Sequence, residues 1–229
     1  MARLTERFFM GGNPTDVETL FIMESPGEQE LVCDYACVGR TGYVMTKYLC
    51  KSNAVSLGCL MKNKRESRFA IFETFDFPLI TLLQDTLNTS FDKVMHELKD
   101  VDSRYGETER DMHYKELKKF WEDSRNDIFY SEKKDFIERY KKNLHSAIAS
   151  LHNLKIIVVC GYIAQSCFMQ AFIPEGFQKG FPPYGSLFSI PELKKFRLYF
   201  SNHPSVELRQ KNKKAWKYGC DYKNGKILI

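Results

Sequence analysis

Residues 20–27 read Leu-Phe-Ile-Met-Glu-Ser-Pro-Gly, an apolar, strand-forming run that leads directly into a tight turn. Three further apolar runs, at residues 69–75, 155–160 and 196–200, have the same character. The segments between them show the apolar spacing of helices. This alternation predicts an α/β fold: a central, mainly parallel four-stranded sheet flanked by helices, in a single domain that spans residues 1–229.

Two helices and an insertion are expected between the strands. Residues 40–50 are predicted to form the first helix, and residues 136–152 a crossover helix that leads into the third strand. Residues 84–135 are dense in charge, but their apolar residues, such as Phe91, Val94 and Leu98, have helical spacing. No glycine- or serine-rich linker interrupts them, so we expect a helical insertion packed on the core.

Composition restricts the class of protein. The formal net charge is +5, which permits a nucleic-acid partner without requiring one. Seven cysteines, an odd number without paired C-x-x-C spacing, indicate reduced thiols rather than a disulfide framework. No apolar run approaches the roughly 18 residues needed to span a bilayer. We therefore expect a cytoplasmic monomer with no membrane association.

Polar, turn-forming residues follow the first and last predicted strands. Glu24 and Ser-Pro-Gly follow the first, and Asn202, His203 and Pro204 follow the last. The carboxyl edge of an open α/β sheet is where ligands bind. Proline and glycine force a tight loop that can aim a carboxylate and backbone N–H groups at a ligand, although each block alone is equally typical of an ordinary turn.

Taken together, these blocks resemble the uracil-DNA glycosylase superfamily, and most closely its iron–sulfur branch. Met23-Glu24-Ser25-Pro26-Gly27 is similar to the first motif, Glu30 to a second acid, and Cys37-Val38-Gly39-Arg40-Thr41-Gly42 to the segment after it. The segment Gly161-Tyr162-Ile163-Ala164-Gln165 resembles a Leu-Gly-x-x-Ala motif, and His203-Pro204-Ser205 the last motif. The resemblance covers about three quarters of the chain, and the insertion has no counterpart in it.

The resemblance implies hydrolysis of the bond between a flipped-out DNA base and its deoxyribose. Glu24 would stabilise positive charge on the sugar or orient water, His203 would stabilise negative charge on the departing base, and Glu30 would be the second catalytic acid. The implied base pocket contains Ser25, Pro26, Gly27, Cys37 and either Phe72 or Glu73. Val206 or Leu208 could fill the space that the flipped base leaves, or could belong to the hydrophobic core. The lysines after them could contact DNA phosphates or form a solvated helix face. The implied DNA contacts are Arg40, Ser205, Val206, Leu208, Arg209, Lys211, Lys213 and Lys214.

Three departures from the family bear on cofactor and substrate. No cysteine precedes Glu24 and the cluster spacing is missing, so we expect no iron–sulfur cluster, no metal and no other cofactor. The position of the family's aromatic residue that stacks on uracil is occupied by Cys37, whose smaller side chain leaves room in the implied base pocket. The family's asparagine that hydrogen-bonds the uracil edge falls at Phe72 or Glu73. A carboxylate at this position would only accept hydrogen bonds, which suits the amine of cytosine. Alternatively, Glu73 is an exposed acid at the strand end.

The leading hypothesis from the sequence is a DNA glycosylase for a modified base, for example a glucosylated cytosine in phage DNA, acting in antiviral defence. Uracil in DNA is the runner-up substrate. Two other classes stay open: a catalytically inactive member that binds DNA or a protein, and an unrelated α/β enzyme whose Ser-Pro-Gly loop holds phosphate.

Overall fold

The computed structural model describes residues 3–52, 54–77, 89–103, 110–124, 126–173, 180–182, 187–205, 222–223 and 226–227. The chain forms an α/β fold whose main sheet has the strand order β1-β3-β2-β4-β6-β5. The four inner strands are parallel, whereas β1 and β5 pair antiparallel at the two edges. The main-sheet strands are β1 (Phe8–Met10), β2 (Thr19–Met23), β3 (Phe69–Glu73), β4 (Ile156–Cys160), β5 (Leu187–Phe188) and β6 (Arg197–Ser201).

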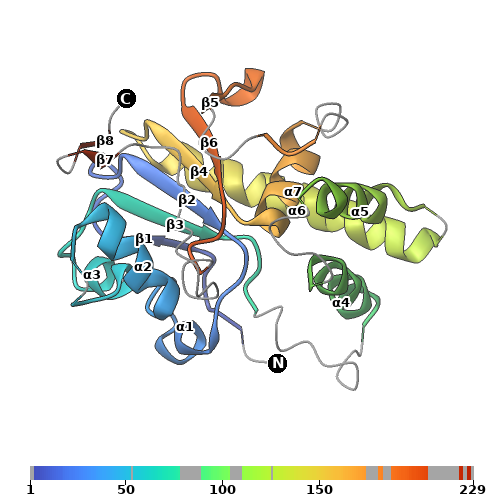
Figure 1. Ribbon diagram of the computed structural model, residues 1–229, viewed down its shortest axis with the longest axis horizontal. Coiled ribbons are helices and arrows are strands. Elements are labelled where there is room, and N and C mark those ends of the chain that lie inside the picture. Colours follow the sequence, from blue (N-terminus) through green and yellow to red (C-terminus); the bar gives the residue numbers. More distant parts are fainter. Residues whose placement is uncertain are drawn as a thin grey trace.

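Helices cover both faces of this sheet (Figure 1). One face carries α1 (Glu28–Cys33), α2 (Arg40–Leu49) and α3 (Leu57–Lys62); the other carries α4 (Ser90–Ser103), α5 (Arg110–Glu122), α6 (Asp127–Ser150) and α7 (Tyr162–Phe172). Every residue of β2, β3 and β4 is buried, as expected for parallel strands covered on both sides. A short 3₁₀ helix spans Pro191–Leu193, and β7 (Tyr222–Lys223) pairs with β8 (Lys226–Ile227) in a separate ribbon.

Successive side chains along each strand pack into hydrophobic cores on opposite faces of the sheet. Leu20 and Ile22 pack with α4–α7, whereas Phe21 and Met23 pack with α2 and α3. The chain first adds β3 on one side of β2 and then crosses to place β4 on the other side. The order of the strands therefore reverses between β2 and β4, which is where open α/β sheets bind ligands, beyond the carboxyl ends of the strands.

The predicted α/β class and the four parallel strands are confirmed, with shifts of one or two residues at strand ends. The main sheet has six strands rather than the expected four, because β1 and β5 extend its two edges. The helix expected over residues 40–50 is confirmed as α2, but it is the second helix along the chain, because α1 precedes it. The predicted boundary between insertion and crossover helix, at residue 135, is wrong: α6 runs unbroken from Asp127 to Ser150. Residues 84–88 and 104–109 of the insertion lie outside the described residues.

Candidate active site

Glu24 lies at the reversal of strand order. It follows β2 directly, and its Oε1 accepts a hydrogen bond of 3.2 Å from the backbone N–H of Ile163, in the first turn of α7. The N-terminus of a helix favours negative charge, so this contact suits a carboxylate. Gly161 caps α7 at φ +90° and ψ 160°, and a Cβ atom there would lie 2.1 Å from Glu24 Oε1. The glycine is thus required both by its backbone angles and by the carboxylate beside it.

The turn after β6 is hydrogen-bonded to the same N-terminus of α7. The carbonyl of Ser201 accepts hydrogen bonds from Gly161 N–H (2.9 Å) and from Gln165 Nε2 (2.6 Å). Asn202 is 4% exposed, and His203, which follows it, is half-buried. Glu24 and the Asn202–His203 turn therefore flank the N-terminus of α7 from the strands on either side of β4.

The turn also determines the tautomer of His203. Its Nδ1 accepts a hydrogen bond from the backbone N–H of Ser205 (3.2 Å) and lies 2.7 Å from the Ser205 hydroxyl. Because a backbone N–H can only donate, Nδ1 must be the acceptor, and a neutral ring then carries its proton on Nε2. A neutral His203 can thus donate a hydrogen bond only through Nε2.

Glu30 is held by the loop around it. Its carboxylate accepts hydrogen bonds from the backbone N–H groups of Gly27, Cys37 and Gly39. It sits three residues after the N-cap of α1, so the contact with Gly27 is half of a capping box. Burial raises the pKa of Glu30, and these hydrogen bonds oppose the rise. These contacts hold the carboxylate within the loop between β2 and α2, and the catalytic role expected from the sequence stays a prediction.

Glu73 is the unusual acid of the site. It ends β3, is 2% exposed, and its Oε2 has no hydrogen-bond partner among the described residues. Burial, and then the negative charges of Glu30 and Glu24, raise the pKa of Glu73 well above its usual value. The reading of Glu73 as an exposed acid is therefore wrong. The expectation of an acceptor-only carboxylate also changes, because the neutral acid that this site favours can donate as well as accept.

The side chains of Phe72 and Glu73 point to opposite faces of the sheet. Only one of them can therefore occupy the position expected to hydrogen-bond the base. Phe72 packs edge-on against Tyr140 of α6, with 5.9 Å between ring centroids, and belongs to the core. Cys37 lies on the Glu73 side: burial raises the pKa of its thiol, and the charge of Glu73 adds to the rise. Of the predicted pocket residues, Cys37 and Glu73 are thus brought together, and Phe72 is not.

The remaining predicted residues have different outcomes. Ser25 is half-buried and Pro26 is buried in the loop after β2, and Arg40 is exposed at the start of α2. The N-terminus of α7 received no role in the sequence-based prediction, although a glycine between an apolar strand and a helix was a usable signal. Val206, Leu208, Arg209, Lys211, Lys213 and Lys214 lie outside the described residues.

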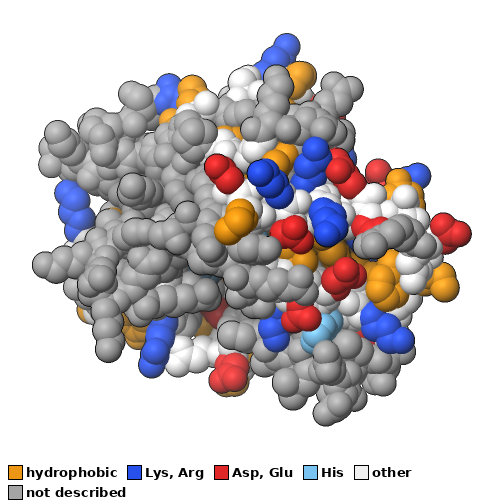
Figure 2. Space-filling model, turned by 45° about the vertical axis from the view of Figure 1, so that its right-hand side comes forward, with side chains coloured by type: hydrophobic (Ala, Val, Ile, Leu, Met, Phe, Trp, Pro, Cys, Tyr) orange, Lys and Arg blue, Asp and Glu red, His pale blue; other side chains and the backbone are white. Residues whose placement is uncertain are grey.

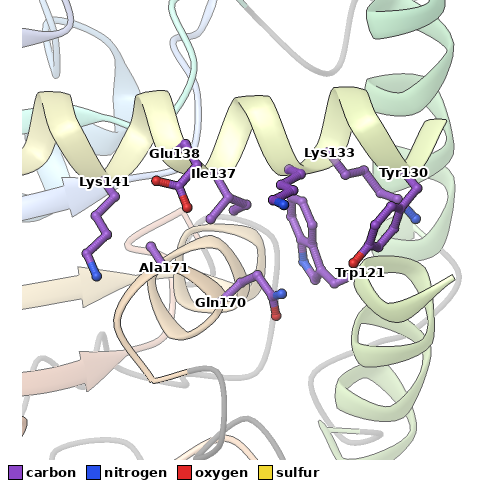
Figure 3. Close-up of a pocket in the computed structure, with 9 residues that line it drawn as sticks. Trp121, Tyr130, Lys133, Ile137, Glu138, Lys141, Gln170 and Ala171 are labelled. Atoms are coloured by element: carbon purple, nitrogen blue, oxygen red, sulfur yellow. The ribbon is translucent and has the colours of Figure 1, made fainter. Parts of the chain in front are cut away.

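Two cavities lie away from Glu24. One, of about 430 Å³, is enclosed by α5, α6 and α7 (Figure 3). The other, of about 560 Å³, lies between the β1 strand and α6. Figure 2 shows the face of the molecule that is reached by bringing the right-hand side of Figure 1 forward. The described residues on this face carry interspersed acidic and basic side chains, so they do not form a uniform basic surface. Neither cavity contains a predicted catalytic residue.

In the part of the chain that the structure describes, no group of three or more histidine, cysteine, aspartate or glutamate side chains could hold a metal ion. No described helix is long and apolar enough to cross a membrane.

Replacing Glu73 by glutamine should stabilise the protein at neutral and alkaline pH. The folded state binds the Glu73 proton more tightly than the unfolded state does. Stability is therefore complete below the ordinary carboxyl pKa and is lost as the pH rises to the raised pKa, by up to about 1.4 kcal/mol per pH unit. Glutamine keeps the shape but cannot ionise. Urea unfolding over a pH series should show that the difference in free energy of unfolding between Glu73→Gln and the wild type grows with pH. The same pH dependence of this free energy in both proteins would contradict the raised pKa. Glu28→Gln, at an exposed acid, is the control.

A scan of the chain against models of known protein families finds no match. A search of curated proteins likewise finds no relative.

Proposed function

We propose that the protein is a DNA glycosylase that hydrolyses the N-glycosidic bond of a flipped-out modified base. The observation that carries this proposal is the position of Glu24: a carboxylate on the N-terminus of α7, at the reversal of strand order. Glu73 ends the adjacent strand β3, and His203 follows β6, which lies on the far side of β4. We further propose a cytoplasmic monomer with DNA as its partner.

The chemistry follows from the residue types. Bond cleavage builds positive charge on the sugar and negative charge on the base. Glu24 would stabilise the first and orient the attacking water, because its carboxylate is fixed by Ile163. His203 would donate from Nε2 to the base oxygen on which negative charge collects, since Nδ1 is occupied by Ser205. Each group acts through a hydrogen bond or its charge, without a cofactor.

The leading substrate is an enlarged cytosine, such as glucosylated cytosine in phage DNA, with antiviral defence as the setting. Cys37 supplies a small side chain where the family has a ring, and Glu73 can accept from the cytosine amine. A protonated Glu73 would also suit the runner-up, uracil. The buried, unpartnered Glu73 favours its neutral form, which can donate to a uracil carbonyl and accept from the ring N–H.

A panel of single-stranded and duplex oligonucleotides tests the proposal. Each oligonucleotide carries uracil, cytosine, hydroxymethylcytosine or glucosylated hydroxymethylcytosine, and abasic sites are counted after incubation. We expect release of the glucosylated base by the wild-type protein and about a hundredfold slower release by Glu24→Gln under the same conditions. Release of uracil alone would replace the leading substrate by the runner-up. Binding to DNA with no abasic sites from any base would favour the inactive member, and neither binding nor release would overturn the proposal.

A further inference from the structure

The helical insertion makes a buried hydrogen bond to α7. Trp121, near the end of α5, is 3% exposed, and its indole Nε1–H donates to the hydroxyl of Ser166 over 3.2 Å. Figure 3 shows Trp121 on the wall of the cavity beneath α6. A buried indole N–H normally finds an acceptor, but this acceptor is itself committed to another contact. Ser166, which is fully buried, donates its own hydroxyl proton to the carbonyl of Ile163 over 2.9 Å.

Ile163 connects this contact to the candidate active site. Its carbonyl accepts from Ser166, and its N–H donates to Glu24 Oε1 over 3.2 Å. Three successive hydrogen bonds thus run from Trp121 through Ser166 and Ile163 to Glu24. A serine hydroxyl can rotate, and bonding back to the helix carbonyl three residues earlier tends to distort a helix. The indole N–H restricts this rotation and so fixes the first turn of α7.

A second contact from α5 supports the same turn. The ring of His113, which is 1% exposed, packs on Tyr162 with 4.3 Å between ring centroids and 60° between ring planes. Tyr162 is the first residue of α7 and the direct neighbour of both Gly161 and Ile163. Two side chains of the insertion therefore hold the short segment whose backbone binds Glu24.

We propose that Trp121 is a positioning residue for Glu24, and that the insertion thereby forms part of the catalytic architecture. This inference rests on the proposed function for its catalytic consequence, whereas the contact itself can be tested without activity. The insertion would set the orientation of the carboxylate, since small displacements of a catalytic group are costly to the rate.

The experiment uses Trp121→Phe, which keeps an aromatic ring and removes the N–H. Its first readout is the hydrogen-exchange rate of the Ile163 amide, measured by NMR on isoleucine-labelled protein. Glu24→Ala removes the carboxylate acceptor and gives the rate of the released amide. We expect Trp121→Phe to move the Ile163 rate toward that reference. Phe9→Leu, which removes volume from the core on the opposite face of the sheet, should not.

The second readout is kinetic. Trp121→Phe should lower kcat by about three- to tenfold with KM nearly unchanged. In a Glu24→Gln background the same substitution should change kcat by less than about twofold, because residues that act as a unit are not additive. Equal losses in the two backgrounds would show general destabilisation and overturn the proposal, as would an unchanged Ile163 rate. If the wild-type protein releases no base, the proposed function fails, and the exchange rate alone decides whether Trp121 holds the Glu24 contact.

Discussion

Replacing Glu24 by glutamine is expected to lower base release by about a hundredfold while leaving the fold intact. Glutamine has the same length, and its carbonyl oxygen can still accept the hydrogen bond from Ile163 N–H. The substitution therefore removes the negative charge and keeps the position. Charge stabilisation of the developing sugar cation would be lost, and the attacking water would lose its strongest acceptor.

Single-turnover release of the preferred base measures this effect, because it isolates the chemical step from product release. Glu28→Gln is the matched control: the residue is an exposed acid at the start of α1, four residues along the chain, and its loss should leave the rate unchanged. Circular dichroism and urea midpoints should coincide for the three proteins. A rate within a few-fold of wild type in Glu24→Gln would remove Glu24 from the mechanism.

The four parallel strands were predictable because they are buried on both faces and therefore read as continuous apolar runs. The edge strand β1, with Phe8 and Met10 only partly buried, is too short to stand out, and its pairing with β3 depends on contacts distant in sequence. The helix α1 is six residues long and begins at a loop glycine without a side-chain cap, so the acidic residues of its first turn are only a weak local signal of its start. In these elements tertiary contacts decide the structure.

The candidate site was predictable to the extent that it depends on strand ends. Glu24 and Asn202–His203 follow apolar strands and lie at the predicted edge. The state of Glu73 could not be predicted, because it depends on burial and on the nearby charges of Glu24 and Glu30. The loop role of Glu30 likewise depends on three backbone N–H groups that only the folded loop brings together.

Gly161→Ala should be strongly destabilising and should also disturb Glu24. The backbone angles of Gly161 fall in a region that is essentially restricted to glycine, where a side chain costs on the order of 1–3 kcal/mol. The new Cβ would also lie 2.1 Å from Glu24 Oε1, so that either the carboxylate or α7 must move. We expect a loss of about 3 kcal/mol or more in the free energy of unfolding, and a fall in base release comparable to that of Glu24→Gln.

Gly180→Ala separates the two causes. Gly180 also has a positive φ, +98°, but a Cβ there would meet nothing within 4 Å, so that variant carries backbone strain without a clash. It should lose about 1–2 kcal/mol and keep its activity. Combining Gly161→Ala with Glu24→Ala removes the clashing carboxylate, and the cost of the alanine should then fall toward the Gly180→Ala value. Urea denaturation of the four variants measures these differences. An unchanged cost of Gly161→Ala in the Glu24→Ala background would mean that the carboxylate does not occupy the space beside the glycine, and that the N-terminus of α7 does not hold Glu24 in solution.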